Sequence, residues 1–277
     1  MGLISRAARA LLPPDQQGRL EELRFADAGH GFDRLGMSRE SIIRSVAGTR
    51  FLYEAWFRVD SRGIESIPGE GPVILAANHS GTLPFDGMML WADVVRRSDP
   101  PRIVRLVADS FVPRLPFVYT LFSRNGVIAG NRATVDHVLA DGEIAGIFPE
   151  GVPGIAKPRS EAYQLKEFRV GHAELAIRHG APIVPVGIVG AEEQWPELAR
   201  LERFHLFGAP YLPIPATPVP LPVKYRIRYG TAIDPRERWA PEQADDPAFV
   251  RALAAEVRAR VQALVDEGLR ERQGLFR

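Results

Sequence analysis

The sequence of 277 residues lacks cysteine altogether and has only three lysines, against 32 arginines. Without cysteine the chain has no disulfide, no thiolate metal ligand and no thiol nucleophile. This composition fits a reducing compartment, so we expect a cytoplasmic protein. A Gly-x-Ser-x-Gly turn, the usual setting of a nucleophilic serine in α/β hydrolases, is also absent. A covalent mechanism through serine or cysteine therefore finds no support in the sequence.

Long apolar runs and a large net charge are lacking as well. The most apolar window, residues 103–122, contains three charged side chains and two prolines, so no segment is expected to cross a membrane. The apolar stretch at the N-terminus is interrupted by Arg6 and Arg9, unlike a secretory signal. The formal net charge of +1 argues against the broad basic surface of a nucleic-acid-binding protein.

What the sequence does contain is an alternation of short apolar runs with helical patterns over residues 59–277. This alternation predicts an α/β domain in which helices flank a mostly parallel central sheet. Residues 1–58 are predicted to form an N-terminal helical segment. The run at 182–189 contains two prolines, which favours an edge strand or a strand end. Strands are expected near residues 73–75, 102–108, 144–148, 182–189 and 224–229, and helices near 38–57, 88–95, 134–139, 166–179 and from 246 onward.

Three segments are candidates for contact with lipid. The first surrounds Pro13 and Pro14 and predicts one or two short helices, with leucine and isoleucine on one side and Arg6 and Arg9 on the other. Such an amphipathic helix either lies in a membrane interface or packs on the domain, and both interpretations stay open. Residues 111–122 alternate prolines with large apolar side chains, for which burial in the core is slightly favoured. The proline-rich stretch 204–222 is interpreted as a lipid-facing loop.

The stretch at residues 73–86 is the most informative in the chain. A buried strand is predicted to end at Asn78, and the turn that follows carries His79 and, seven positions later, Asp86. A carboxylate that accepts the imidazole N–H fixes the tautomer and stabilises the imidazolium that forms when the other nitrogen takes a proton. His79 is therefore a candidate general base, although such a pair taken alone is more often structural, as part of a capped loop.

Other polar residues follow other predicted strands. Because the carboxyl ends of parallel strands meet at one edge of a sheet, His79, Arg132 and Glu150 are expected to share one rim. The planar guanidinium of Arg132 suits phosphate oxygens, and Gly151 lets backbone N–H groups approach a ligand closely. The alternatives are a solvated Arg132, an ion-paired or helix-capping Glu150, and a metal held by His79, Asp86 and Glu150.

Four blocks of this sequence resemble, in order and separation, those of the glycerolipid acyltransferases, including the 1-acylglycerol-3-phosphate acyltransferases. The continuation after Gly151, with the proline-rich stretch, resembles most the branch of diacylglycerol acyltransferase-like proteins and their bacterial relatives. The resemblance implies transfer of a fatty acyl group from acyl-CoA or acyl carrier protein to a lysophospholipid or related glycerolipid, at a membrane surface. The blocks are NHSGTLPFD (78–86), GVIAGNR (126–132), FPEG (148–151) and PIVPVGIVG (182–190).

The resemblance also implies roles for individual residues. His79 would deprotonate the acceptor hydroxyl and Asp86 would orient it, while Arg132 would bind a phosphate or carboxylate of the acceptor. The block Phe148, Pro149, Glu150 and Gly151 would shape the acceptor site. One departure concerns spacing: the family's block has four residues between the histidine and the aspartate, whereas this chain has six. The loop must therefore bulge if Asp86 is to reach the imidazole.

The remaining expectations concern ligands and location. Lys157, Arg159 and Lys166 are candidates for contact with phosphates of CoA or of a lipid head group, or else form a solvated basic loop. No cofactor is expected beyond acyl-CoA or acyl carrier protein as co-substrate, and no metal. The protein is expected to be peripheral on the inner face of the cell membrane. The alternative functions are a metal-assisted lipid hydrolase and a non-catalytic lipid-binding protein.

Overall fold

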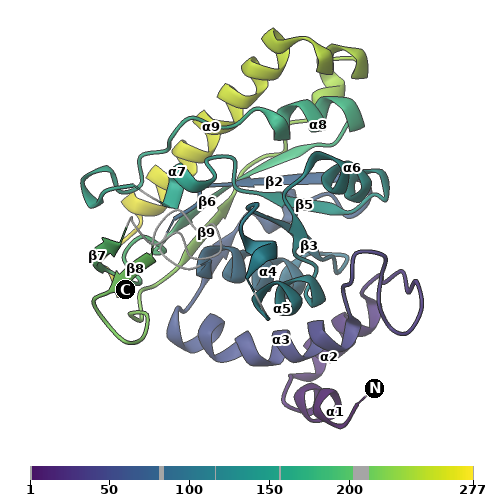
Figure 1. Ribbon diagram of the computed structural model, residues 1–277, viewed down its shortest axis with the longest axis vertical. Helices are drawn as coiled ribbons and strands as arrows, with labels where there is room; N and C mark the ends of the chain where they lie inside the picture. The colour runs from purple at the N-terminus through teal and green to yellow at the C-terminus, as the bar shows by residue number, and fades with distance from the viewer. Residues whose placement is uncertain (1, 81–83, 116, 156, 202–211, 277) are drawn as a thin grey trace.

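The computed structural model describes residues 2–80, 84–115, 117–155, 157–201 and 212–276 (Figure 1). Within them a seven-stranded sheet forms the centre of the molecule, and every strand pair is parallel except β6 with β9. This confirms the α/β fold with a mostly parallel sheet. The strand order is β1 (Asp60–Arg62), β9 (Arg226–Tyr229), β6 (Ile183–Val189), β2 (Val73–Ala77), β5 (Ile144–Ile147), β3 (Val104–Ala108) and β4 (Ile128–Ala129).

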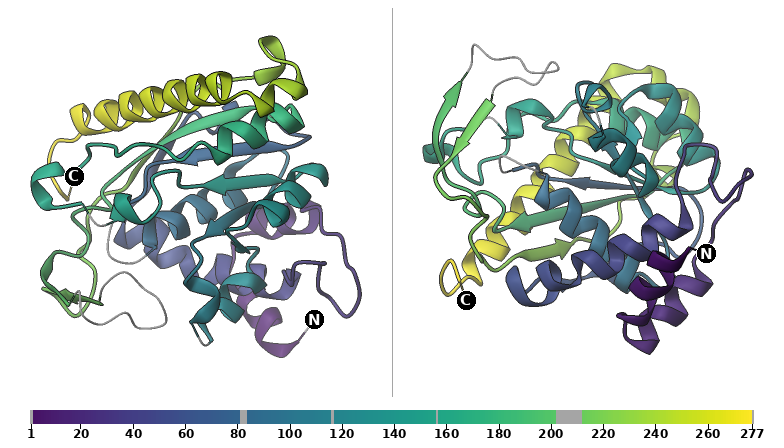
Figure 2. Two further views of the ribbon diagram at one scale, coloured as in Figure 1. Left: turned by 45° about the horizontal axis from the view of Figure 1, so that its top comes forward. Right: turned by 60° about the horizontal axis from the view of Figure 1, so that its bottom comes forward.

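Helices cover both faces of this sheet, so the central strands are apolar on both sides. In β2, Val73 and Leu75 belong to one buried cluster and Ile74 and Ala76 to another. The first cluster is covered by α3 (Arg39–Phe51) and α4 (Phe85–Arg97), and the second by α6 (Arg132–Ala140), α8 (Gly171–His179) and α9 (Pro247–Arg270). Figure 2 shows α9 lying across the sheet, as the apolar periodicity of this helix predicted.

The shorter elements lie around these layers. A separate antiparallel pair is formed by β7 (Glu197–Leu201) and β8 (Leu212–Pro215). A turn of π-helix, Leu52–Trp56, continues α3. The remaining α-helices are α1 (Leu3–Ala10), α2 (Pro14–Glu22), α5 (Val118–Arg124) and α7 (Val152–Ile155). Among the described residues, none of these helices or the longer ones is both long and apolar enough to cross a membrane.

Two predictions from the sequence were wrong in detail. β6 is an interior strand although it contains Pro185, because this residue lies beside the end of β9: its carbonyl accepts from the N–H of Gly230, one residue beyond β9, at 2.9 Å, and the register with β9 runs from Val186 to Val189. α8 begins at Gly171 and not at 166, because the backbone before it is engaged elsewhere: Lys166 N donates to Glu150 Oε2 at 2.8 Å and Arg169 N to the carbonyl of Pro149 at 2.9 Å.

The N-terminal helices share their core with the sheet across the expected boundary at residues 58 and 59. Leu12, Ile42 and Phe57 are buried in the same cluster as Leu75. A fully buried carboxylate strengthens this connection, since Asp93 of α4 accepts hydrogen bonds from hydroxyl groups of the N-terminal segment, β1 and β9. The donors are Tyr53, Ser61 at 2.6 Å and Tyr229 at 2.8 Å.

The candidate lipid segments differ in their exposure. α1 and the two residues after it pack on α3 through Ser5 and Leu12, whereas the apolar residues Leu3, Ile4 and Leu11 are exposed. Burial of residues 111–122 is contradicted, because Phe117 is 88% exposed and Val118 and Leu121 of α5 are exposed too. Of the stretch 204–222, residues up to 211 lie outside the described part of the chain, and Val219 is exposed.

Candidate active site

The carboxyl ends of β2, β5 and β4 meet at one edge of the sheet, where His79, Glu150 and Arg132 follow them (Figure 1). Asn78 anchors the turn after β2. Its buried amide accepts a hydrogen bond from the N–H of Ile188 at 2.7 Å and donates to the carbonyl of Ile188 at 2.9 Å. This pairing joins the turn to β6, and the site therefore stands on two adjacent strands of the rigid sheet.

Asp86 reaches the imidazole of His79 in spite of the longer spacing. Its Oδ2 lies 2.6 Å from His79 Nδ1, although residues 81–83 of the connecting loop lie outside the described residues. Asp86 is fully buried in the first turn of α4 and also accepts hydrogen bonds from the N–H groups of Ser80 at 2.9 Å and Gly87 at 2.7 Å. Since the carboxylate accepts at Nδ1, the lone pair is left on Nε2.

The surroundings of His79 set both its orientation and its charge. The ring of Phe148 stacks on the imidazole with centroids 4.4 Å apart and an angle of 29° between the planes. Burial by itself lowers the pKa of His79, whereas the charge and hydrogen bond of Asp86, with the charge of Glu150, raise it. The raising effects prevail, so the pKa of His79 lies above its ordinary value of 6.5.

Glu150 lies directly beneath the histidine turn. The carboxylate is buried and accepts hydrogen bonds from His79 N at 3.2 Å and from Lys166 N at 2.8 Å. A Cβ atom at Gly154 would lie 2.8 Å from the Cβ of Glu150 and 3.0 Å from the carbonyl oxygen of His79, so only glycine fits there. Glu150 thus connects the histidine turn to the segment that follows the FPEG block.

The surroundings of Lys157 fit neither of the two expectations from the sequence, a contact with phosphate or a position in a solvated loop. Its side chain is 3% exposed and its Nζ lies 3.4 Å from Glu150 Oε2 and 3.3 Å from Glu192 Oε1. One buried and one mostly buried carboxylate therefore already neutralise this ammonium group, since a buried charge is stable only when it is paired. Lys166, the third candidate, pairs with Glu161 at the surface.

Arg132 lies at the start of α6, where the side chain of Asn131 caps the helix by accepting from the N–H of Thr134 at 2.9 Å. The guanidinium is 59% exposed and pairs with Glu174 of α8. In the described part of the chain no hydrogen bond or ion pair connects Arg132 to His79 or Glu150. It is accessible at the same rim without touching the pair.

The sequence interpretation missed Arg169. Its guanidinium packs against Gly151, where a Cβ atom would lie 2.9 Å from Cζ, and Gly151 has the left-handed φ of 59°. Arg169 is exposed, and no ion pair to it is formed within the described ranges. In the sequence, Arg169 is simply an arginine two residues before α8, and no spacing pattern indicates which residue it contacts.

Backbone N–H groups of residues 80–82 would be candidate donors to the carbonyl oxygen of a substrate, and this segment is described only as far as Ser80. The N–H of Ser80 is engaged by Asp86, and Gly81 and Thr82 lie outside the described residues. Two buried side-chain atoms, Ser80 Oγ and Gln194 Nε2, have no hydrogen-bond partner in the described part of the chain. His172 is buried with a pKa lowered by that burial to about 4, and so it stays neutral near pH 7. Within the described ranges no three His, Asp or Glu side chains form a metal-binding group.

Comparison with known proteins agrees with this site. A family model described as acyltransferase matches residues 58–189. An uncharacterized protein of Mycobacterium tuberculosis is 37% identical over 237 residues, which are 82% of this chain and 66% of that protein. The DGAT1/2-independent enzyme synthesizing storage lipids of Bos taurus is 30% identical over 76% of this chain and 60% of its own length. The chain therefore spans about 60–66% of the length of these relatives.

The fold has a counterpart among solved structures. The crystal structure of PlsC, the 1-acyl-sn-glycerophosphate (LPA) acyltransferase of Thermotoga maritima, matches with a TM-score of 0.56. The two chains are 18% identical, and the match covers 85% of this chain and 83% of PlsC. At this identity the likeness concerns the fold. Family model, relatives and fold support the glycerolipid acyltransferase family that the four sequence blocks predicted.

Proposed function

We propose that this protein transfers a fatty acyl group from a thioester donor, acyl-CoA or acyl carrier protein, to a hydroxyl group of a lysophospholipid or related glycerolipid. The observation that carries the proposal is the pair of His79 and Asp86 at the end of β2, inside a block of the acyltransferase family. The names of two matched proteins, an LPA acyltransferase and an enzyme of storage-lipid synthesis, support the same class of acceptor.

In the proposed reaction His79 acts as a general base. Asp86 accepts a hydrogen bond from the Nδ1–H of His79. Nε2 takes the proton of the acceptor hydroxyl while the oxygen of that hydroxyl attacks the thioester carbonyl. The new C–O bond forms, the C–S bond breaks, and the imidazolium returns the proton to the departing thiolate. General-base catalysis contributes about 10²–10⁴-fold. The remaining acceleration comes from holding both substrates in line and from donors to the carbonyl oxygen.

The direct test follows release of the thiol from acyl-CoA or acyl carrier protein. Thiol release that requires a lysolipid and resists a chelator supports the transferase. Release without an acceptor that stops with chelator would indicate a metal-assisted hydrolase instead. No release at all from either donor, with lipid copurifying, would indicate a non-catalytic lipid-binding protein.

Asp86→Asn is expected to lower activity less than the loss of His79, because the base remains while its orientation and its charge partner are lost. The raised pKa of His79 places the acid limb of the kcat/KM profile above pH 6.5, since only neutral imidazole accepts a proton. Removing the carboxylate charge should move this limb to lower pH. Profiles of wild type and variant with one donor measure the shift. Coincident limbs would mean that another group sets this pKa.

Arg132→Ala is expected to raise the KM for a phosphorylated acceptor by about tenfold with little change in the KM for the donor, because a charge-assisted contact to one substrate is lost. Arg178→Ala is the matched control, since Arg178 also pairs with Glu174. Steady-state kinetics with both substrates varied provide the measurement. A similar rise for both substrates, or in the control, would place Arg132 outside the acceptor site.

We also propose that α1 attaches the protein to anionic membranes on the cytoplasmic side. Leu3, Ile4 and Leu11 are exposed, and Arg6 adds charge that contributes roughly 1 kcal/mol per residue near anionic lipid. Replacing the three apolar residues by serine should weaken sedimentation with anionic vesicles at low salt. These substitutions test the exposed apolar residues more specifically than a deletion of the N-terminal segment, which would also remove the buried Leu12. Leu198→Ser, on β7, serves as the control, and equal binding by all forms would exclude α1.

A further inference from the structure

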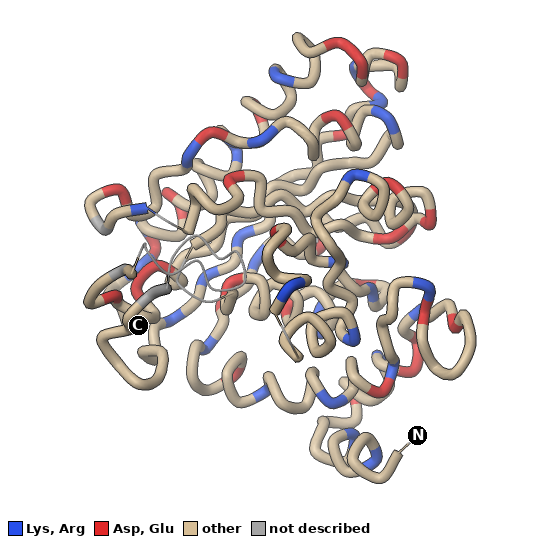
Figure 3. The backbone as a smooth tube through the Cα atoms, viewed as in Figure 1, with Lys and Arg blue, Asp and Glu red and all other residues tan. Residues whose placement is uncertain are grey.

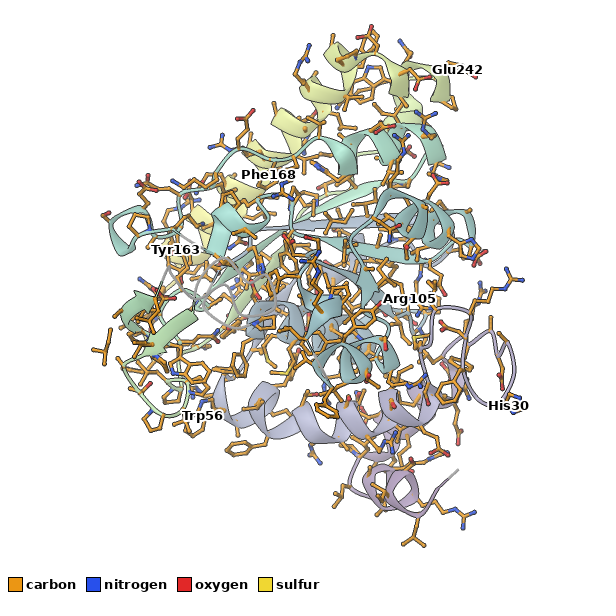
Figure 4. The ribbon with its side chains drawn as sticks, in the orientation of Figure 1. His30, Trp56, Arg105, Tyr163, Phe168 and Glu242 are labelled. Carbon is orange, nitrogen blue, oxygen red and sulfur yellow. The ribbon has the colours of Figure 1, made fainter. Side chains whose placement is uncertain are left out.

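A pocket of about 370 Å³ lies where the first turns of α3 meet the loop before this helix and the end of α5. None of its residues belongs to the candidate active site or to the four family blocks. His30 of the loop lies at the outer edge of the molecule (Figure 4). The wall of the pocket includes His30 and Phe32 of the loop, Ser38, Glu40 and Arg44 at the start of α3, and Arg124 of α5.

The loop that closes the pocket is fixed by its own hydrogen bonds. The carboxylate of Asp27 accepts from the N–H groups of Gly29 at 2.8 Å and Gly31 at 3.2 Å. His30, between the two glycines, has a left-handed φ of 58°, which is uncommon for a residue other than glycine. Such a conformation persists only where the surrounding structure imposes it. The loop therefore forms a defined wall of the pocket.

Two arginines bring positive charge to the pocket. Arg124 lies over the ring of Phe32, with Cζ 4.1 Å from the ring centroid, and its Nη1 donates to the carbonyl of Gly36 at 3.0 Å. Arg44 is exposed and donates to Ser41 Oγ at 2.9 Å. Neither guanidinium forms an ion pair within the described ranges. Figure 3 shows acidic and basic residues interspersed along α3 and the loop, so this unneutralised charge is a local property of the pocket.

The start of α3 adds hydrogen-bond donors. The first turn of any helix leaves N–H groups without a carbonyl partner in that helix, and an N-cap side chain often accepts from them. Ser38 is the N-cap residue of α3, but its side chain makes no such bond. It is 6% exposed, lines the pocket, and its hydroxyl forms no hydrogen bond to any described residue. A nearly buried hydroxyl without a partner is costly, so the pocket favours a ligand that accepts from it.

One carboxylate also lines the pocket, but α1 engages it. Glu40 Oε1 accepts from the N–H of Gly2 at 2.7 Å, and Oε2 accepts from the hydroxyl of Ser5 at 3.0 Å. Two arginines against one glutamate leave the pocket positive. Glu40 also connects the pocket to the beginning of α1, where Leu3 and Ile4 are 85% and 70% exposed. The pocket thus lies beside the apolar residues that are proposed to enter a membrane.

We propose that this pocket binds a phosphate group. The two guanidinium groups, the hydroxyl of Ser38 and the first turn of α3 are donors that suit a tetrahedral anion, and the positive end of the helix dipole favours its charge. The volume suits one phosphate with its substituent. Two sources present this group, the head group of an anionic phospholipid and a soluble phosphate compound. Only the lipid source rests on the proposed attachment of α1 to a membrane.

Inorganic phosphate is the first probe, and its binding to the whole chain is followed through the amide NMR shifts of residues 39–41. Saturable shifts are expected in wild type, and Arg44→Ala should bind at least about tenfold more weakly, because a charge-assisted contact is lost. Ser38→Asp should abolish binding and raise the melting temperature, because its carboxylate takes the place of the anion and caps the helix.

Arg260→Ala is the matched control, since it removes the same charge from an exposed position on α9, and it should bind phosphate like wild type. Shifts that do not saturate in wild type overturn the proposal. Equal weakening in Arg44→Ala and the control, or unchanged affinity in Ser38→Asp, overturns it as well, because the charge of the whole protein and not this pocket would then attract the anion.

Vesicles of phosphatidylcholine and phosphatidylglycerol in equal amounts distinguish the two sources. For a lipid head group, Arg44→Ala should sediment with them less than Arg260→Ala, and phosphate should release wild type more than sodium chloride of the same ionic strength. For a soluble phosphate compound, both variants should bind the vesicles equally while their affinities for phosphate differ. Neither measurement requires acyl transfer, so a chain that binds phosphate here but transfers no acyl group retains this site and loses the proposed function.

Discussion

Replacement of His79 by alanine is expected to lower acyl transfer by at least about 10²–10⁴-fold, because the reaction loses the group that takes the acceptor proton. The side chain is 20% exposed and stands at a strand end, so its removal opens no large cavity in the core. Asp86 keeps its two backbone donors but loses its imidazole partner. We therefore expect some loss of stability alongside the loss of activity, and both need to be measured.

His79→Gln is the variant that separates the two effects. A glutamine amide retains a donor for Asp86 and a planar group against Phe148, but it cannot serve as a base. Thermal unfolding should place this variant near wild type, while initial rates with acyl-CoA and lysolipid should remain as low as for alanine. Near-normal transfer by a folded His79→Gln protein would remove His79 from the proposed mechanism.

Glu150→Ala should give the largest loss of stability of any single change at the site, about 3 kcal/mol of the free energy of unfolding. The carboxylate is buried, and its removal leaves Lys157 beside Glu192 alone of these two carboxylates and leaves two backbone N–H groups without their acceptor. Breaking a buried ion pair costs far more than breaking an exposed one because the remaining charge stays desolvated. Denaturant unfolding of both proteins measures the difference.

The matched control for Glu150 is Glu161→Ala. Glu161 pairs with Lys166 only a few residues away, but both side chains are largely solvated, at 40% and 38% exposed. Removing an exposed partner should cost less than about 1 kcal/mol. Glu150→Ala combined with Lys157→Met should recover part of the lost stability, because the buried cation that has lost one of its carboxylate partners is then removed as well. Equal costs for the two single variants would show that Glu150 does not hold the site together.

Several features of this protein could be determined from the sequence alone. The alternation of apolar runs with amphipathic helices predicted the α/β fold, because a parallel sheet buried on both faces needs runs such as that of β2. The rim shared by His79, Arg132 and Glu150 followed from the direction of parallel strands. The four blocks predicted the family. Each of these features is either a local pattern of residues or a consequence of regular strand and helix geometry, and both can be recognised in a sequence.

What only the tertiary structure decided concerns contacts between distant segments. Asp86 reaches His79 Nδ1 in spite of the longer spacing, Lys157 is buried between Glu150 and Glu192, and the segment before α8 stays outside the helix. Pro185 is accommodated inside the sheet because it lies beside the end of β9. Likewise, the pocket at the start of α3 exists only because the loop before this helix and the end of α5 meet there. Each outcome depends on which groups meet in three dimensions and how far they are buried, and neither spacing nor composition carries that information.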